Sequence, residues 1–416
     1  MWIFPKKILS SRWLLFFYLP FIITNIEGIF PLPRPMPKTK DQTSSNNQFR
    51  ELIFQFFDLV REERTFILLI GVLFFIAAVV YPYPGIAMWF GFLVAAYSAV
   101  SNDSIQTLGT FIASNANRQW YVLWLYIGGL FLVTVTVGWF MYDGGVSFGR
   151  LRTTETDGSL SFPQPDNFAF LQIAAPIFLL ILTRLRMPVS TTFLLLSSFA
   201  ISPSAVGSVI NKSLSAYLIA FVLGLVVWFL ITNITRRYFV GKPKVGWAVA
   251  QWITSGTLWS VWIMQDAANI AIYLPRSLNV AQFLGFALIV FLGLGLIFFL
   301  KGDKIQDIVN EKTEVTDIRA ATIIDFVYAL ILIYKLTIST IPMSTTWVFI
   351  GLLGGRELGI RLRERANGEA QKGGILGTLR MIGKDVGLAT VGLIVSVLLA
   401  MAVNEQFRVQ VLEFFS

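Results

Sequence analysis

Two copies of a short hydroxyl-rich motif stand where helices are expected to begin. Pro188–Thr192 reads Pro-Val-Ser-Thr-Thr, and Pro342–Thr346 reads Pro-Met-Ser-Thr-Thr. Proline suits the first turn of a helix and serine or threonine suits its N-cap, where backbone N–H groups lack helical partners. Such a helix start attracts anions, and hydroxyl groups add further donors. The candidate anion ligands are Ser190, Thr191, Thr192, Ser344, Thr345 and Thr346.

Three aspartates fall inside apolar segments, where a carboxylate is costly and usually functional. In Asn102-Asp103-x-x-Gln106 and Gln265-Asp266-x-x-Asn269, the carboxylate and the second amide share one helix face. Carboxylate and amide oxygens suit a hard cation such as Na⁺, and a carboxylate can instead take a proton. The expected cation-binding residues are Asn102, Asp103, Gln106, Gln265, Asp266, Asn269 and Asp325, with Asp103 and Asp266 as the Na⁺ ligands.

Both assignments have a structural alternative. A single Pro-x-Ser-Thr-Thr motif is more simply an ordinary capped helix start near the membrane interface. The aspartate motifs can also be packed polar contacts between helices, and Asp325 is equally consistent with a coupling site or a structural role. Two copies of each motif in the same order along the chain favour the functional interpretation.

The composition predicts an all-α polytopic membrane protein. The chain has 416 residues, of which 55% are hydrophobic and only 14% charged, against about 25% charged in soluble proteins. It contains no Cys and no His, so disulfide, thiol and Cys/His metal chemistry are excluded. We find no nucleophile and base typical of an enzyme. The net charge of +9 is interpreted as basic loops that set orientation, and nucleic acid is not an expected partner.

Apolar runs predict about 10 to 12 membrane segments, counting the roughly 20 residues needed to cross a bilayer. Residues 1–64 form a hydrophobic segment, expected to be an uncleaved span, followed by a basic linker. The remaining crossings are expected at 66–81, 86–115, 120–141, 168–183, 188–211, 214–235, 249–275, 280–300, 320–336, 342–355 and 386–403.

The basic residues and the repeated motifs together predict an inverted repeat. Placing the basic clusters at 34–64, 236–244, 301–319 and 356–384 on the inside gives a consistent crossing scheme. In that scheme the two aspartate segments run in opposite directions, and so do the two Ser-Thr-Thr segments. We therefore expect two inverted repeats, 65–244 and 245–416, with broken helices and re-entrant half-helices. Such repeats are typical of secondary transporters that bind their substrate between the two halves.

These motifs resemble those of the inorganic phosphate transporter (PiT) family, which comprises cation-coupled symporters of phosphate and, in some members, sulfate. The family carries two inverted Gly-Ala/Ser-Asn-Asp-Val-Ala-Asn-Ala motifs, each followed by Pro-x-Ser-Thr-Thr-His. Asn102, Asp103, Gly109 and Thr110 match the first copy, and Asp266, Ala268 and Asn269 match the second. The order of motifs covers about 86–403, most of the chain.

The resemblance implies roles for individual residues. Asn102, Asp103, Asp266 and Asn269 would take part in Na⁺ or H⁺ binding. The anion would be bound by Ser190, Thr191, Ser344 and Thr345, with Thr192 and Thr346 nearby. The chain departs from the family pattern at Gln106 and Gln265, where the family has Asn, and at Phe193 and Trp347, where it has His.

The predicted function is cation-coupled secondary transport of inorganic phosphate by alternating access, with Na⁺ or H⁺ as the coupling ion and no other cofactor. A permease for sulfate or another oxyanion of the same fold is the alternative. An ion channel, or a receptor that retained the fold without transporting, belongs to a different class. Phosphate or sulfate, Na⁺ or H⁺ and the lipid bilayer are the expected partners, and a homodimer is left open.

Overall fold

The computed structural model describes residues 63–155, 157–185, 187, 189–299, 317–369 and 374–415. The chain divides into two compact units, Met1–Ile76 and Ala77–Ser416. Most of the first unit, including the predicted N-terminal span and basic linker, lies outside the described residues, as do Pro188 and most of the basic loop at 301–319. All the candidate site residues belong to the second unit.

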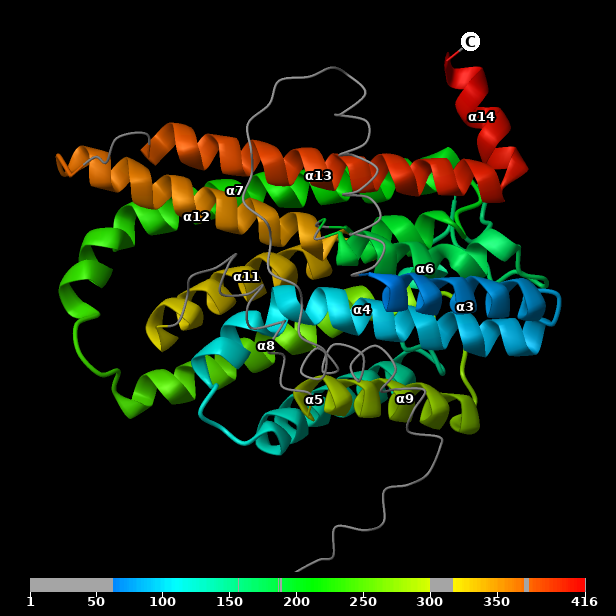
Figure 1. Cartoon of the computed structure of the whole chain (residues 1–416), viewed down its shortest axis with the longest axis horizontal. Coiled ribbons are helices and arrows are strands. Elements are labelled where there is room, and N and C mark those ends of the chain that lie inside the picture. Colours follow the sequence, from blue (N-terminus) through cyan, green and yellow to red (C-terminus); the bar gives the residue numbers. More distant parts are fainter. Residues whose placement is uncertain are drawn as a thin grey trace, which may run out of the picture. The chain divides into compact units, whose positions relative to one another are not determined.

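The described residues form helices and loops and no β-sheet, which confirms the all-α fold (Figure 1). The helices before residue 240 are α3 (Arg64–Val80), α4 (Pro84–Ser114), α5 (Trp120–Met141), α6 (Phe170–Arg184) and α7 (Pro203–Tyr238). Two short turns interrupt them, a 3₁₀ turn at Arg150–Arg152 and a π-helical turn at Thr192–Leu196. The later helices are α8 (Val245–Ala271), α9 (Val280–Phe299), α11 (Ile318–Ile338), α12 (Thr345–Ala366), α13 (Gly374–Val403) and α14 (Glu405–Phe415).

Six helices of the described residues are long and apolar enough to cross a membrane, so the chain is a multi-pass integral membrane protein. These six are α4, α5, α7, α9, α11 and α13, and α3 and α6 are shorter apolar helices. The 27-residue α8, expected as a crossing at 249–275, is unbroken but less apolar. The polar residues of its aspartate motif lie inside the helix and lower its mean hydropathy. All of them are buried.

The crossings predicted at 188–211 and 214–235 are wrong in their boundaries. The boundary between them, at residues 212–213, lies inside the single helix α7, where Lys212 and Ser213 are buried. The helix begins instead at Ser202, whose hydroxyl caps it by accepting from the backbone N–H of Ala205, with Pro203 in the first turn. Buried contacts for polar side chains, which one sequence does not reveal, explain the error.

The predicted re-entrant half-helices also differ from what is observed. The second was expected to end near residue 353, but α12 continues without a break to Ala366. The first was expected over 189–200, but only a short helical stretch around the five-residue π-helical turn at Thr192–Leu196 forms there. Gly354 and Gly355, at the predicted end, lie inside α12 and pack against neighbouring helices.

Glycines allow α7 and α12 to pack with their backbones in direct contact. A Cβ atom at Gly355 would lie 2.0 Å from the carbonyl oxygen of Phe221, and one at Gly359 would lie 2.5 Å from that of Leu225. Gly351 similarly faces Tyr217, so glycines at every fourth position of α12 line the contact. Figure 1 shows α12 beside α7 along much of its length and beside α13 on another side.

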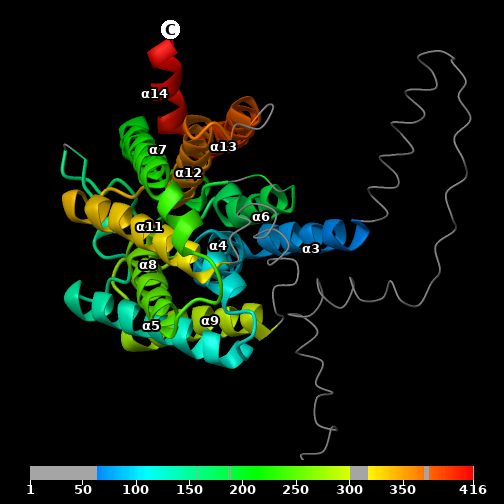
Figure 2. The same ribbon diagram turned by 90° about the vertical axis from the view of Figure 1, so that its left-hand side faces the viewer.

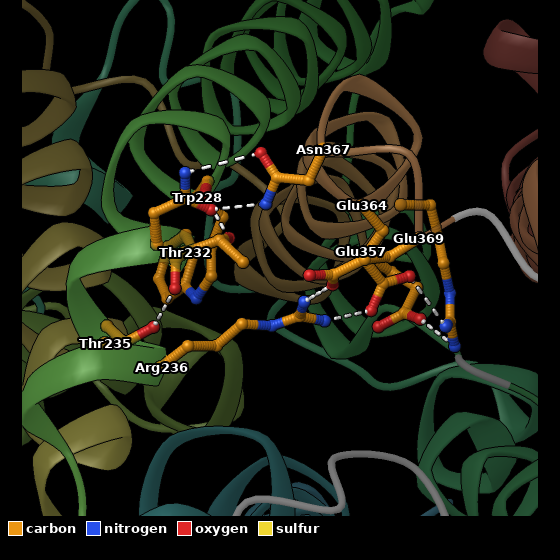
Figure 3. A network of polar contacts seen from close by, with 10 residues as sticks. Trp228, Thr232, Thr235, Arg236, Glu357, Glu364, Asn367 and Glu369 are labelled. Carbon is orange, nitrogen blue, oxygen red and sulfur yellow. Dashed lines mark hydrogen bonds and ion pairs between the residues drawn. The ribbon is translucent and has the colours of Figure 1, made fainter.

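Polar contacts join the same two helices at their far ends (Figure 3). Arg236 of α7 forms ion pairs with Glu364 and Glu369, and Asn367 donates to Asn233 at 2.8 Å. These contacts bring two of the predicted inside clusters, at 236–244 and 356–384, to the same end of the helix pair. The crossing scheme requires that arrangement.

Helices α4, α8 and α11 pack together and carry the three membrane-embedded aspartates. In the end-on view of Figure 2, α8 lies between α11 and α5, and it contacts both. Inside α6, Pro176 cannot donate to the carbonyl of Gln172, and the Tyr273 hydroxyl donates to that oxygen instead at 2.9 Å. That bond links α6 to the loop that follows α8.

Candidate functional site

The two Ser-Thr-Thr motifs meet in the interior and exchange equivalent hydrogen bonds. Thr192 of the first donates its hydroxyl to the carbonyl oxygen of Met343 in the second, at 3.1 Å. Thr346 of the second donates to the carbonyl oxygen of Val189 in the first, at 3.4 Å. Because each bond runs from the last residue of one motif to the second residue of the other, the motifs are related by an approximate two-fold exchange.

The serine of each motif plays the same local role. The hydroxyl oxygen of Ser190 accepts from the backbone N–H of Phe193 at 3.1 Å, and that of Ser344 accepts from Trp347 at 3.2 Å. Both are N-cap bonds, and they fix the direction in which each helical turn starts. Ser190, Ser344 and their neighbouring threonines are almost completely buried, so these caps lie in the protein interior.

Asp103 of α4 is fully buried and binds the first motif directly. Its Oδ2 accepts from the hydroxyl of Thr191 at 2.8 Å. Asn102 donates from Nδ2 both to Asp103 Oδ1 at 2.8 Å and to the carbonyl oxygen of Val189 at 3.1 Å. The first aspartate motif and the first Ser-Thr-Thr motif are therefore joined by hydrogen bonds. Gln106 belongs to the same helix, but its side chain lies outside the described part.

Asp266 and Asn269 of α8 reach the same motif from the other half of the chain. Asn269 Nδ2 lies 2.7 Å from Asp266 Oδ1, 3.1 Å from Thr191 Oγ1 and 3.2 Å from Thr192 Oγ1. Thr192 also donates to Asp266 Oδ1 at 3.3 Å. The hydroxyls of the first motif thus bridge the two aspartate motifs.

Three buried oxygens around Asp266 have no hydrogen-bond partner among the described residues. They are Asp266 Oδ2, Asn269 Oδ1 and Gln265 Oε1, and Gln265 Nε2 is also unpaired. An unpaired buried polar atom costs roughly 1–3 kcal/mol, so a group of them indicates a missing partner. One carboxylate oxygen and two amide oxygens match the ligands that a hard cation prefers.

Asp325 of α11 occupies a separate polar contact. Its Oδ1 accepts from Thr110 of α4 at 2.7 Å, and its Oδ2 accepts from Ser255 of α8 at 2.5 Å. Among the described residues no hydrogen bond connects it to either Ser-Thr-Thr motif. Both of its oxygens have partners, in contrast to Asp266, and it ties three helices together. Ser255 was not singled out from the sequence because an isolated serine in an apolar helix carries no pattern.

Three buried basic residues near the second motif were also not predicted as site residues. Arg150 donates from Nη1 to the carbonyl oxygen of Thr340 at 3.1 Å, and Lys212 donates to that of Ser339 at 2.9 Å. Lys335 donates to the Ser215 hydroxyl at 2.7 Å. Burial lowers the pKa of Arg150, which lies in a loop, to about 10, and the Asp266 charge opposes that shift, so the guanidinium is positive at neutral pH.

Aromatic residues stand where the resembling family has His. Phe193 and Trp347 pack edge to face with ring centroids 5.6 Å apart. Trp347 is 6% exposed, and its Nε1 has no hydrogen-bond partner among the described residues. This unpaired donor directly follows the Ser-Thr-Thr sequence. The sequence marked the position only as a departure from the family pattern.

The fold and these buried polar residues define a polytopic α-helical membrane protein with a polar cluster in its interior. No family model matches the chain, and no curated protein sequence matches it. Among solved structures, a sodium-dependent phosphate transporter is similar, with 19% sequence identity and a TM-score of 0.46. That similarity covers 75% of this chain and 98% of the transporter.

Proposed function

We propose that this protein is a cation-coupled transporter of inorganic phosphate and not an enzyme. The observation that carries the proposal is the shared position of Thr191 and Thr192, which belong to an anion motif and hydrogen-bond both aspartate motifs. Transport coupled to an ion needs a physical link between the two binding sites, because each ligand must change the affinity for the other. Here the link is a direct side-chain contact.

The coupling follows from competition for the same hydroxyl groups. With no cation bound, Thr191 and Thr192 donate to Asp103 and Asp266, whose negative charges also repel an oxyanion. A Na⁺ ion or a proton at these carboxylates offsets their negative charge. The hydrogen bonds that the threonine hydroxyls donate to them then become weaker. The hydroxyls can then rotate and donate to the anion, so cation binding raises anion affinity.

The unpaired atoms of the cluster supply the remaining ligands. Asp266 Oδ2 and the amide oxygens of Gln265 and Asn269 are proposed as cation ligands, because they are buried and lack partners among the described residues. Trp347 Nε1 is a buried, unpaired donor beside the second motif, and it is proposed as an anion ligand together with the hydroxyls of Ser344 and Thr345.

Phosphate is favoured over sulfate by the acceptors in the cluster. At neutral pH, phosphate retains a proton that can be donated to a carboxylate, whereas sulfate has none. The hydroxyl donors suit either anion. The same site would therefore also bind sulfate, but the carboxylates would receive no hydrogen bond from it. Alternating access would require the bonds that Thr192 and Thr346 exchange between the halves to break and reform.

The test is uptake by the purified full chain in proteoliposomes, with labelled phosphate or sulfate and imposed Na⁺ or pH gradients. Saturable phosphate uptake that stops when the gradient is removed is the expected result. Uptake that rises linearly with concentration and ignores the gradients would identify a channel. Phosphate binding without any flux would identify a receptor, and preference for sulfate would reassign the substrate.

A further inference from the structure

Three basic side chains converge near the start of the second motif. Arg150 comes from the loop between α5 and α6, Lys212 from α7 and Lys335 from α11. Arg150 Nη1 and Lys212 Nζ both contact the carbonyl oxygen of Ser339, at 3.3 Å and 2.9 Å. Lys335 Nζ binds the hydroxyl of Ser215, which itself donates to the backbone carbonyl of Lys212 at 2.8 Å. We call Arg150, Lys212 and Lys335 the basic cluster.

The basic cluster has no carboxylate in direct contact with it among the described residues, although the charge of Asp266 acts on Arg150. The three residues are 2%, 8% and 4% exposed, respectively. Within the described ranges, none of them forms an ion pair, and their acceptors are backbone carbonyls and one hydroxyl. Arg150 and Lys335 both repel the Lys212 ammonium. Burying like charges together is expensive unless an opposite charge joins them.

A purely structural role explains only part of the cluster. Arg150 and Lys212 hold the carbonyls of 339–341, which end α11 and carry the negative end of its dipole. Among the described residues, no hydrogen bond joins Lys335 to residues 339–341. Lys335 uses one of its three N–H groups on Ser215, and its charge repels that of Lys212. Holding residues 339–341, the linker between α11 and α12, in place therefore does not explain why a third basic residue lies here.

We propose that the basic cluster is a second anion site, which takes a tetrahedral oxyanion before it reaches the Ser-Thr-Thr motifs. An oxyanion carries two or more acceptor oxygens and would use the remaining ammonium N–H groups of Lys212 and Lys335. The linker 339–341 leads directly into Pro342–Thr346, so the cluster adjoins the second motif. In the predicted crossing scheme all three residues lie toward the outside. The identity of the anion in this inference, a phosphate-like oxyanion, rests on the proposed function.

The experiment measures how many phosphate ions the purified full chain binds, by equilibrium dialysis with labelled inorganic phosphate. The wild type is expected to bind two phosphate ions. Lys212→Gln/Lys335→Gln should bind one, and Lys335→Arg, which keeps the charge, should bind two. The charge-matched control Lys242→Gln/Lys384→Gln changes two exposed lysines and should bind two.

The inner-site variant Ser344→Ala/Thr345→Val separates this inference from the proposed function. It should lose uptake yet retain one bound phosphate ion, the one at the basic cluster. Two bound ions in Lys212→Gln/Lys335→Gln would overturn the second site, and so would a single ion in the wild type. If the second ion is present but the wild type transports nothing, the proposed function fails and the basic cluster stands as a binding site.

Discussion

The hydroxyl of Thr191 donates to the carboxylate of Asp103 at 2.8 Å, across 88 positions of the chain. The same hydroxyl accepts from Asn269 of α8 at 3.1 Å. One threonine of the first Ser-Thr-Thr motif therefore contacts both aspartate motifs, one from each predicted repeat. A ligand that changes the charge on Asp103 also changes the strength of its hydrogen bond with Thr191. This contact is therefore a direct physical route for coupling between a cation and an anion.

Asp103→Asn is expected to uncouple transport from the driving cation. The amide keeps the shape and can still accept from Thr191, but it carries no charge for Na⁺ or H⁺ to neutralise. Phosphate binding should persist and lose its dependence on the cation, as measured by binding titrations with and without Na⁺ and at two pH values. Asp157→Asn, which removes an exposed carboxylate in a loop, is the control. Full cation dependence in Asp103→Asn would exclude Asp103 from the coupling site.

Ser344→Ala/Thr345→Val is expected to remove the phosphate ion bound at the Ser-Thr-Thr motifs, and with it uptake, while the protein still folds. Loss of the N-cap of α12 costs about 1 kcal/mol, which a helix packed this closely against α7 should tolerate. Ser202→Ala/Thr257→Val is the matched control, since it removes the N-cap of α7 and an exposed threonine away from the motifs. Calorimetry should show a cooperative unfolding transition for both variants, and only the first should lose the phosphate ion bound at the motifs. Unchanged affinity in the first would refute the anion assignment.

Gly355→Ala is expected to destabilise the protein without any change in charge or polarity. The added Cβ would lie 2.0 Å from the Phe221 carbonyl oxygen, so α12 must move away from α7. Overpacking of this kind costs about 1–3 kcal/mol. A thermal melt in detergent should show a clear fall in melting temperature for Gly355→Ala. Gly383→Ala, on α13 with open space around it, should melt like the wild type.

Much of the fold follows from the sequence, because apolar runs of membrane length leave little choice of structure. The bounds of α5 match the expected segment at both ends, and those of α4, α9 and α11 differ by one or two residues. The errors occur where polar groups are buried by tertiary contacts. Lys212 and Ser213, which lie between two predicted crossings, are buried inside the single helix α7. The glycines of α12 were not interpreted as a helix contact, although their spacing of four positions carried that signal.

The candidate site was predictable where residues repeat and not where they occur singly. Both Ser-Thr-Thr motifs and both aspartate motifs come together in the interior, as their repetition suggested. Arg150 belongs to no repeat, and its contact with 339–341 depends on how the loop between α5 and α6 packs against α8. Asp325 was named as a cation ligand, and its role in binding stays a prediction. Its two hydroxyl partners come from different helices and could not be inferred from one sequence.

The inverted topology predicts that cysteines introduced at Val240 and at Asp157 are labelled from opposite sides of the membrane. Val240 follows α7 beside the contact of Arg236 with Glu364, and Asp157 lies in the loop between α5 and α6. Both positions are exposed, and the native chain has no Cys. An impermeant maleimide applied to sealed vesicles, before and after permeabilisation, separates the two sides. Labelling of both from one side would break the crossing scheme.

Trp347→Phe tests whether the departure from the family pattern contributes to anion binding. The change keeps an aromatic ring against Phe193 but removes Nε1, the buried donor without a partner among the described residues. A hydrogen bond to a charged group contributes about 1.5–3 kcal/mol, so phosphate affinity should fall roughly 10- to 100-fold. Trp259→Phe is the control, because Trp259 is equally buried and its Nε1 donates to the Ile127 carbonyl at 3.0 Å. That variant should lose stability and keep its affinity, whereas equal affinities in both variants would show that Trp347 only fills space.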